Sequence, residues 1–541
     1  MKLSHFVRCS AIPVLVHSLA PTDEPRDADP PQSGYLPNHN ISPALLSSYT
    51  KKWTMKYNTA EEFYANPLVY TAPNTTKELV ILASIQNIVR ILDSTTGALI
   101  ISRTLDAPYV SSDSNCNDGA TVGITGTPII DTTSNIMYLF TKGYCNGLPG
   151  PQGVINGAYK FWALNVPSLT IVPGYPVLIK GPASNDPQRY FIGGTILQRP
   201  GLAMMQIKWL VGDSVIAGFG GHCDSMNYTD ILIAVSKTPS KGVTDMMEME
   251  VSPGEPADPN LLLGKGGKAG IWQSGMGIAA DTVNNRVFFS TGWPRCQQRS
   301  YRSPAPGKAG TSTLDQAIVN IGVDPVTGLL KQQDYFSPIN YEKLNAGDKD
   351  LSSSGVTLLD PITFSGGGVN RVGVAGSKAG VIYVVNADNL GGFKMGPNSS
   401  DAGKLSDFEK KGFRLTSSVL QELTFAGFCT TCGALQAWKK VLNAQGQPNF
   451  AFAAESNIPL GCHNTPTVTS LNGVAGTAIV WLADTSKGLV AFHAVPNGSV
   501  LTQITLPGSG GLQKFHRPIF GNNHVYVTSS NKLIAIGGVA Q

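Results

Sequence analysis

Short β-rich runs recur along most of the chain, and each is bounded by Gly, Asn, Asp or Pro. The clearest unit spans 78–105, where LVILASIQN, IVRILDSTTG and ALIISRTL predict three strands joined by tight turns. Similar units lie at 121–166, 198–236, 270–328, 353–393, 432–456, 465–494 and 517–537. Short strands repeated in this way are typical of an all-β repeat protein.

The number and order of these units predict a single closed β-propeller of eight blades. Seven blades is the alternative, because the unit at 432–456 is weakly patterned. The last unit, 517–537, supplies three strands, and the isolated run WTMKYN at 53–58 precedes the first complete unit. Pairing of these N- and C-terminal strands would close the ring and remove its exposed edges. A pair of β-sandwiches is the competing architecture.

The N-terminal segments lack the repeat. Residues 1–20 combine Lys2 and Arg8 with an apolar run and small residues, which predicts a signal peptide. Residues 21–50 are rich in Pro, Asp and Ser and predict a flexible arm, so the propeller domain is expected at 51–541. We therefore expect a protein of the secretory pathway or the extracellular space, and five Asn-x-Ser/Thr sequons are compatible with a glycoprotein.

Charge and hydropathy exclude two classes of partner. The net charge is +4 over 541 residues, and basic residues cluster only in pairs such as Lys51 and Lys52, which leaves no footprint for nucleic acid. After the N-terminal segment no stretch approaches the roughly 18–20 apolar residues that span a bilayer, so we expect no membrane partner.

Cysteine positions suggest one cross-link. Loss of Cys9 with the signal peptide leaves seven cysteines, so at least one thiol is free. Cys116 and Cys145 flank one repeat and are the predicted disulfide. The pair Cys429 and Cys432 lacks a second pair at metal spacing, which favours a local disulfide or free thiols over a zinc site.

A family resemblance extends from about 69 to 538. The segments LASIQNIVRILDSTTGALI, GITGTPIID, QRPGL, GIWQSGMGIAAD, DYFSPIN, GSKAGVIYVVNADNLGG and HVYVTSSNKLIAIG resemble those of secreted fungal and bacterial proteins of the quinoprotein alcohol dehydrogenase-like superfamily. This resemblance implies a propeller, while the fold alone leaves the activity open.

Two groups within that superfamily give different expectations. The pyrroloquinoline-quinone dehydrogenases have adjacent cysteines beside the cofactor and acidic or amide calcium ligands, whereas this chain has no Cys-Cys pair and no matching ligand cluster. In length and overall character the chain is similar to the fungal hetero-Diels–Alderases of tropolone-sesquiterpenoid biosynthesis. The resemblance thus implies a cyclase without cofactor or metal that joins a tropolone quinone methide to a humulene-type sesquiterpene. A quinone-dependent alcohol or sugar dehydrogenase, and a non-catalytic secreted binding propeller, are the alternatives.

The start of each unit predicts a site on the propeller axis. A polar residue followed by Gly or Pro precedes the first apolar strand of successive units, and these positions would converge at one mouth lined for hydrophobic substrates. The predicted hydrogen-bond donors are Arg199, Gln273, His463, His516 and Arg517. The predicted substrate contacts are Trp272, His222 and Ser354. The competing interpretation is that these are turn residues that satisfy loop backbone groups.

Overall fold

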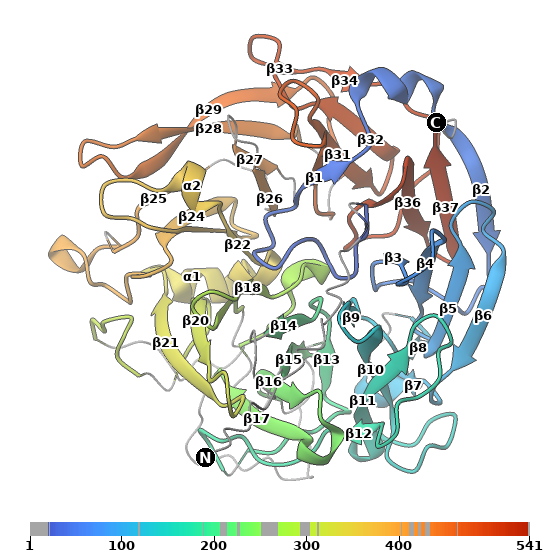
Figure 1. Cartoon of the computed structure of the whole chain (residues 1–541). Coiled ribbons are helices and arrows are strands. Elements are labelled where there is room, and N and C mark those ends of the chain that lie inside the picture. Colours follow the sequence, from blue (N-terminus) through green and yellow to red (C-terminus); the bar gives the residue numbers. More distant parts are fainter. Residues whose placement is uncertain are drawn as a thin grey trace, which may run out of the picture.

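A computed structural model shows eight sheets of four or five strands set around a central axis (Figure 1). The residues that it describes are 20, 22–116, 119–187, 189–205, 214–223, 228–249, 269–292, 303–310, 313–401, 403–409, 416–419, 424–427, 433–461 and 464–538. The prediction of an eight-bladed propeller is confirmed, because the weakly patterned unit does form its own blade. The predicted signal segment lies outside the described residues, except for Ala20.

Blades 1 to 4 follow the chain in order. Blade 1 consists of β3 (Leu68–Thr71), β4 (Glu78–Ala83), β5 (Ile88–Asp93) and β6 (Leu99–Thr104). Blade 2 consists of β9 (Ile129–Asp131), β10 (Ile136–Tyr144), β11 (Gly157–Asn165) and β12 (Val177–Leu178). Blade 3 consists of β13 (Ile196–Gln198), β14 (Ala203–Met205), β15 (Ser214–Gly221), β16 (Ile231–Ser236) and β17 (Val243–Glu248). Blade 4 consists of β18 (Ala279–Asp281), β19 (Arg286–Ser290), β20 (Ile318–Val323) and β21 (Leu330–Phe336).

Blades 5 to 8 complete the ring. Blade 5 consists of β22 (Val356–Leu358), β23 (Val372–Gly376), β24 (Val381–Asn386) and β25 (Ser406–Glu409). Blade 6 consists of β26 (Thr416–Val419), β27 (Thr424–Gly427), β28 (Gln436–Leu442), β29 (Pro448–Ser456) and β33 (Val500–Leu501). Blade 7 consists of β1 (Tyr35–His39), β30 (Thr467–Leu471), β31 (Ile479–Asp484), β32 (Gly488–His493) and β34 (Gln503–Ile504). Blade 8 consists of β35 (Ile519–Gly521), β36 (His524–Ser529), β37 (Lys532–Gly537) and β2 (Thr50–Lys56).

Other elements are short connections. A separate hairpin pairs β7 (Tyr109–Val110) with β8 (Thr121–Val122). The α-helices are α1 (Tyr341–Ala346) and α2 (Pro361–Phe364). The 3-10 turns are Pro43–Ser48, Ser111–Ser114, Val154–Asn156, Pro239–Lys241, Gln273–Gly275, Leu351–Ser353 and Pro397–Ser399. No helix within the described ranges is long and apolar enough to span a bilayer.

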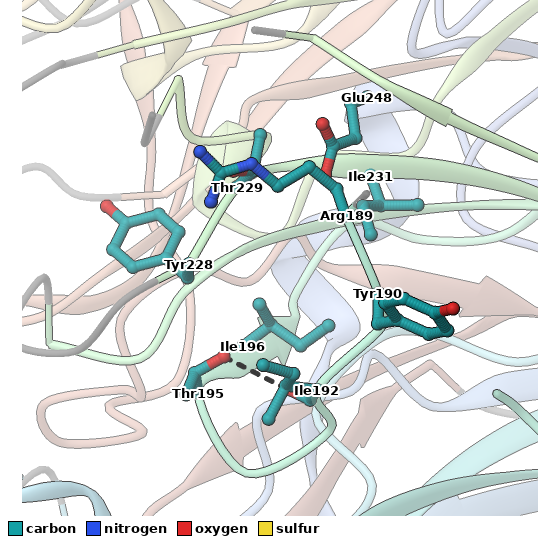
Figure 2. A pocket seen from close by; sticks show the side chains of 9 residues that line it. All are labelled: Arg189, Tyr190, Ile192, Thr195, Ile196, Tyr228, Thr229, Ile231 and Glu248. Atoms are coloured by element: carbon teal, nitrogen blue, oxygen red, sulfur yellow. Dashed lines mark hydrogen bonds between the residues drawn. The ribbon is translucent and has the colours of Figure 1, made fainter. Parts of the chain in front are cut away.

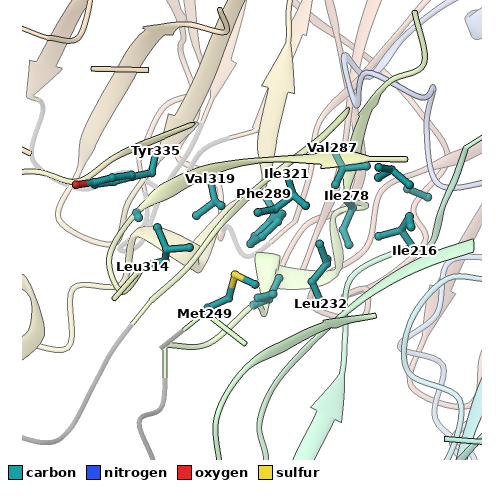
Figure 3. Packing of buried hydrophobic residues seen from close by; sticks show 14 of the residues in the cluster. Ile216, Leu232, Met249, Ile278, Val287, Phe289, Leu314, Val319, Ile321 and Tyr335 are labelled. Carbon is teal, nitrogen blue, oxygen red and sulfur yellow. The ribbon is translucent and has the colours of Figure 1, made fainter. Parts of the chain in front are cut away.

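Burial within a blade depends on distance from its outer edge. Every residue of β31, in the middle of blade 7, is buried, so that strand is covered on both faces. The outermost strand of blade 1, β6, alternates between exposed and half-buried residues over most of its length. Neighbouring blades pack face to face, as Figure 3 shows for Ile216 and Leu232 of blade 3 with Val287 and Phe289 of blade 4. This packing explains the long apolar runs of the middle strands.

The ring closes as the sequence predicts. Strand β2, near the N-terminus, pairs antiparallel with the C-terminal strand β37, and Met55 lies opposite Leu533 in that register. The terminal segments therefore share blade 8, and pairing removes a free edge from each.

The segment 21–50, expected from the sequence to be a flexible arm, packs against the blades over the residues that the structure describes. The segment crosses the inner ends of the blades: Glu24 bridges Val69 of β3, and the carbonyl of Pro30 accepts a hydrogen bond from Ala280 of β18 at 2.7 Å. Strand β1 then pairs in parallel with β30. The inner strands offer unpaired backbone groups, and this segment satisfies them although it lacks a repeat of its own.

Candidate functional site

A cavity of about 230 Å³ lies at the end of the propeller where inner strands begin; we call it the axial cavity. Its lining residues are Leu197, Arg199, Gly221, Cys223, Trp272, Ser274, Asp350, Ser352, Ser353, Lys378 and Phe515. Some of these residues precede the innermost strand of a blade. Others follow the second strand counted from the axis, such as β15 of blade 3. Because adjacent strands are antiparallel, these two kinds of strand end meet on the same face of the propeller.

Arg199 lies in this cavity, at an interruption of the innermost strand of blade 3. Its guanidinium carbon lies 4.7 Å from the ring centre of Phe515 and 5.3 Å from that of Tyr64. Pro200 follows and lacks an N–H for the ladder, which accounts for the break between β13 and β14. Arginine thus presents a planar donor between aromatic surfaces.

Trp272 also borders the axial cavity, as the register of the units predicts. Its indole N–H donates to the carbonyl of Gly221 at 3.1 Å. A Cβ atom added at Gly270 would lie 2.0 Å from the indole, so glycine is needed there for the ring to take this position. The indole is therefore held in place by the backbone of its own loop, at Gly270, and by that of β15, at Gly221.

Lys378 and Asp350 form a charged wall that the sequence analysis missed. The Lys378 ammonium lies 2.5 Å from Asp350 and 2.9 Å from Asp348. Burial alone would lower the pKa of Lys378, but the two carboxylates outweigh it and raise that pKa above its ordinary value. Lys378 lies in the turn between β23 and β24, so a search restricted to inner-strand starts could not find it.

The serines that line the cavity, Ser352 and Ser353, lie two and one residues before the predicted Ser354. Ser354 is buried, and its hydroxyl donates to the carbonyl of Gly376 at 3.0 Å and accepts from the Gly376 N–H at 2.9 Å. Ser352 and Ser353 instead border the cavity, and their hydroxyls have no hydrogen-bond partner among the described residues. Both hydroxyl oxygens are themselves buried, so neither is open to a ligand in the cavity.

The side chains of Gln273 and His516 form hydrogen bonds within the protein and are not among the residues that line the axial cavity. The Gln273 amide is fully buried and donates to the carbonyls of Met276 and Gly277 at 3.2 and 3.0 Å. His516 Nε2 lies 2.6 Å from the carbonyl of Phe63, and its Nδ1 lies 3.1 Å from the Thr528 hydroxyl. Burial lowers the pKa of His516 to about 4. These contacts match the competing interpretation of loop residues with structural partners.

Arg517 likewise forms structural contacts and is not among the residues that line the axial cavity. Its guanidinium lies 2.5 Å from Glu24 and 2.8 Å from Asp27, and all three side chains are buried. Burial alone would lower the pKa of Arg517, but the two carboxylates outweigh it and raise that pKa. His463, the remaining predicted donor, lies outside the described residues.

The predicted disulfide between Cys116 and Cys145 is wrong. Cys116 is bonded to Cys223, with their Cα atoms 5.6 Å apart, whereas Cys145 is an exposed free thiol. The bond joins the β7–β8 connection to the end of β15, a contact between repeats that sequence spacing cannot reveal. His222 precedes Cys223, is buried, and places Nδ1 3.1 Å from the ammonium of Lys142. Burial, then Lys142 and Arg199, lower the pKa of His222 well below its ordinary value.

A second, much smaller pocket lies in blade 3 (Figure 2). Its walls include the buried side chains of Arg189 and Glu248, which lie near one another, and its volume is only about 10 Å³. Burial raises the pKa of Glu248 to about 9, against the opposing effect of Arg189. Such a space admits about one water molecule and no substrate.

Comparisons with known proteins identify the fold. No family model and no curated protein matches the sequence. The quinohemoprotein alcohol dehydrogenase of Comamonas testosteroni superposes with a TM-score of 0.60 at 14% identity, over 96% of this chain and 81% of that one. A quinohemoprotein alcohol dehydrogenase of Pseudomonas putida gives 0.59 at 11% identity over the same shares, and a europium-containing methanol dehydrogenase gives 0.57 at 12% identity over 96% and 98%. The chain has the propeller fold of quinoprotein alcohol dehydrogenases.

The axial cavity does not match the calcium and quinone site expected in such dehydrogenases. Calcium needs six to eight oxygen ligands, usually with several carboxylates. Among the described lining residues the one carboxylate is Asp350, which already pairs with Lys378 at 2.5 Å, and Arg199 adds a second cation to the wall. The disulfide beside the cavity joins cysteines separated by 107 positions rather than adjacent ones. The described walls thus suit an anionic or carbonyl oxygen better than a metal cation.

Proposed function

We propose that this protein is a cofactor-independent cyclase of the hetero-Diels–Alderase type, with the axial cavity as its active site. The observation that carries the proposal is the position of Arg199, held between Tyr64 and Phe515 in a cavity that Trp272 also borders. A flat conjugated carbonyl compound can stack on aromatic rings while a cationic donor binds its oxygen. We take the substrate pair, a tropolone quinone methide and a humulene-type sesquiterpene, from the resemblance of this chain to the fungal hetero-Diels–Alderases.

The chemistry of such a reaction suits these residues. A cycloaddition forms one C–C and one C–O bond from existing π electrons, so no proton, electron or leaving group is transferred. The protein has to hold the reactants in a near-attack arrangement and to stabilise charge that develops on the carbonyl oxygen. Arg199 borders the cavity and can donate to that oxygen.

The size of the cavity supports a proposed position for each reactant. About 230 Å³ is below the roughly 300–1,000 Å³ of pockets that enclose drug-sized ligands. The cavity therefore suits the flat quinone methide alone, and the apolar sesquiterpene would meet it at the opening.

The purified protein, incubated with a quinone-methide precursor and humulene, tests this proposal. We expect faster formation of one adduct isomer than in buffer, where the uncatalysed reaction gives a mixture. Unchanged rate and isomer ratio would refute the cyclase. Chelation of divalent cations should leave the selectivity intact.

A quinone-dependent alcohol or sugar dehydrogenase is the second candidate. The observation in its favour is that the disulfide cysteine Cys223 and the indole of Trp272 border the same cavity, and the superposed propellers are named as alcohol dehydrogenases. A bound quinone would give the purified protein a near-ultraviolet absorption band. Dye-linked alcohol oxidation that appears only after addition of pyrroloquinoline quinone and calcium would establish this candidate over the cyclase.

A further inference from the structure

A cavity of about 700 Å³ lies on the face of the propeller opposite the axial cavity; we call it the polar pocket. The axial cavity lies where innermost strands begin, whereas the polar pocket borders the turn between β35 and β36, where an innermost strand ends. Blades 7, 8 and 1 and the N-terminal segment before β2 all contribute to its walls. The volume falls within the roughly 300–1,000 Å³ that is typical of ligand pockets.

The charged groups of the polar pocket are matched within the protein. The Lys77 ammonium lies 3.0 Å from the Asp93 carboxylate. Glu78 Oε2 accepts from the Asn522 N–H at 2.7 Å, and Oε1 accepts from the Tyr526 hydroxyl at 3.3 Å. Burial raises the pKa of Glu78 and so shifts this group toward its neutral form. The pocket therefore suits a neutral polar ligand better than an ion.

Two amide side chains from opposite ends of the sequence meet in the wall. The Asn40 amide nitrogen lies 3.5 Å from the Asn522 amide oxygen, which is long for a hydrogen bond, and both side chains are exposed. A hydroxyl group both donates and accepts, so one bound between these amides would form a shorter bond to each. The Ser42 hydroxyl, in the same wall, does not cap the 3-10 turn Pro43–Ser48 and adds a further group of this kind.

His524 adds a flat, half-buried ring to the wall. Its plane lies 12° from that of Tyr526, with the ring centres 6.0 Å apart. Nδ1 lies 2.8 Å from the Asn522 carbonyl, and because a carbonyl oxygen only accepts, this nitrogen carries a proton. In the neutral imidazole Nε2 is then an acceptor. The ring is thus held by a neighbour and a backbone group, and it offers an apolar surface beside a hydrogen-bonding edge.

We propose that the polar pocket binds a neutral saccharide. A sugar ring has an edge of hydroxyls, which would bond to the amides of Asn40 and Asn522, and a C–H face, which would pack against His524. Besides its charged residues, the described part of the lining offers amides, hydroxyls and one imidazole as polar groups, all of which bind hydroxyls. The site is on the other face from the axial cavity, so its failure would leave the proposed cyclase untouched, and the reverse also holds.

Such a ring can come from two sources. One is a free saccharide. The other is a glycan attached to the wall itself, because Asn40, Ile41 and Ser42 form one of the five sequons. Protein made in a bacterial host carries no such glycan and therefore tests the free sugar, whereas protein from a glycosylating host tests the attached one.

The bacterial protein is titrated with glucose, mannose, galactose and N-acetylglucosamine, and binding is followed by ligand-observed NMR. We expect saturable binding of at least one of them. The double variant N40A/N522A should weaken it at least about tenfold, because two hydrogen-bonding groups are lost. N497A removes an exposed asparagine between β32 and β33, outside the pocket, and should change nothing. Circular dichroism checks folding, and H524A tests the same pocket if the double variant does not fold.

The second arm compares glycans on protein from a glycosylating host. A glycan at Asn40 that occupies the pocket should exclude the free sugar, and an N-glycosidase should release it from native protein more slowly than one at Asn497. Denaturation should remove that difference. The proposal is overturned if folded N40A/N522A or H524A binds sugar as tightly as its parent. It is also overturned if the unmodified protein binds none of these sugars while Asn40 carries no glycan or one that is released as fast as that at Asn497.

Discussion

Arg517, near the C-terminus, forms a buried ion pair with Glu24, near the start of the described chain, at 2.5 Å. Asp27 completes the group at 2.8 Å from the same guanidinium. The group fixes the N-terminal segment across the inner ends of the blades, at blade 8. An arginine that the sequence assigns to the active site is therefore part of the closure of the propeller.

Replacement of Arg517 by Met should destabilise the fold. It would leave Glu24 and Asp27 buried without their cation, and loss of one partner of a buried pair typically costs about 3–5 kcal/mol. Chemical denaturation of R517M should show a fall of this size. Adding E24Q and D27N to R517M should recover part of the loss, whereas wild-type stability of R517M alone would mean that the pair contributes little.

His516 should make the protein sensitive to acid. Its pKa is about 4 in the folded protein and near 6.5 when unfolded, so between these pH values the unfolded chain binds more protons. The contribution of this histidine to stability is therefore present above pH 6.5 and lost as the pH falls toward 4, by up to about 1.4 kcal/mol per pH unit. The unfolding free energy of H516Q should fall less steeply over this window than that of the wild type. Parallel curves would contradict the assignment of a neutral, buried imidazole.

The disulfide can be tested by mapping and by stability. Peptides from unreduced protein should link Cys116 to Cys223, while Cys145 should react with iodoacetamide without denaturant. Because the bond closes a loop of 107 residues, its replacement by two serines should lower the unfolding free energy by about 4–5 kcal/mol. A peptide that joins Cys116 to Cys145 would contradict the structure.

The fold could be predicted because the strand and turn pattern that specifies each blade lies within one short stretch of sequence. Each unit carries its own strands and turns, and even the weakly patterned unit 432–456 contributes strands β28 and β29 to a blade of its own. The segment 22–34 has no such pattern, and its order depends on backbone contacts with distant strands such as the bond from Leu358 to Pro31. Contacts of that kind leave no periodic signal in the sequence.

The candidate site was predictable only in part, for a geometric reason. The register of inner strands leads to Arg199 and Trp272, both of which line the axial cavity. It cannot tell which neighbouring side chain faces the cavity: Phe515 does, while His516 is buried among other partners. Side chains along an extended chain point alternately to opposite sides, so a shift of one residue changes the assignment. Lys378 comes from a turn outside this register.

Arg199 provides the sharpest test of the proposed activity. Its guanidinium lies over Phe515 and Tyr64, so R199M keeps an apolar stem of similar length but deletes the donor. A positioned donor to a developing oxyanion is typically worth about 100- to 1,000-fold in rate. We expect R199M to lose rate by this order and to lose isomer selectivity, with little change in melting temperature.

Two further variants distinguish the loss of a positioned hydrogen-bond donor at Arg199 from a general effect of positive charge on the rate. R199K keeps the charge without the planar group and should recover only part of the rate, because lysine cannot stack or donate as a fork. Lys394 lies 4.9 Å over the Phe393 ring and is not among the residues that line the axial cavity, so K394M removes a comparable cation with no expected effect on rate or selectivity. If R199M and K394M both retain wild-type rate and isomer ratio, Arg199 is structural and the reaction takes place elsewhere.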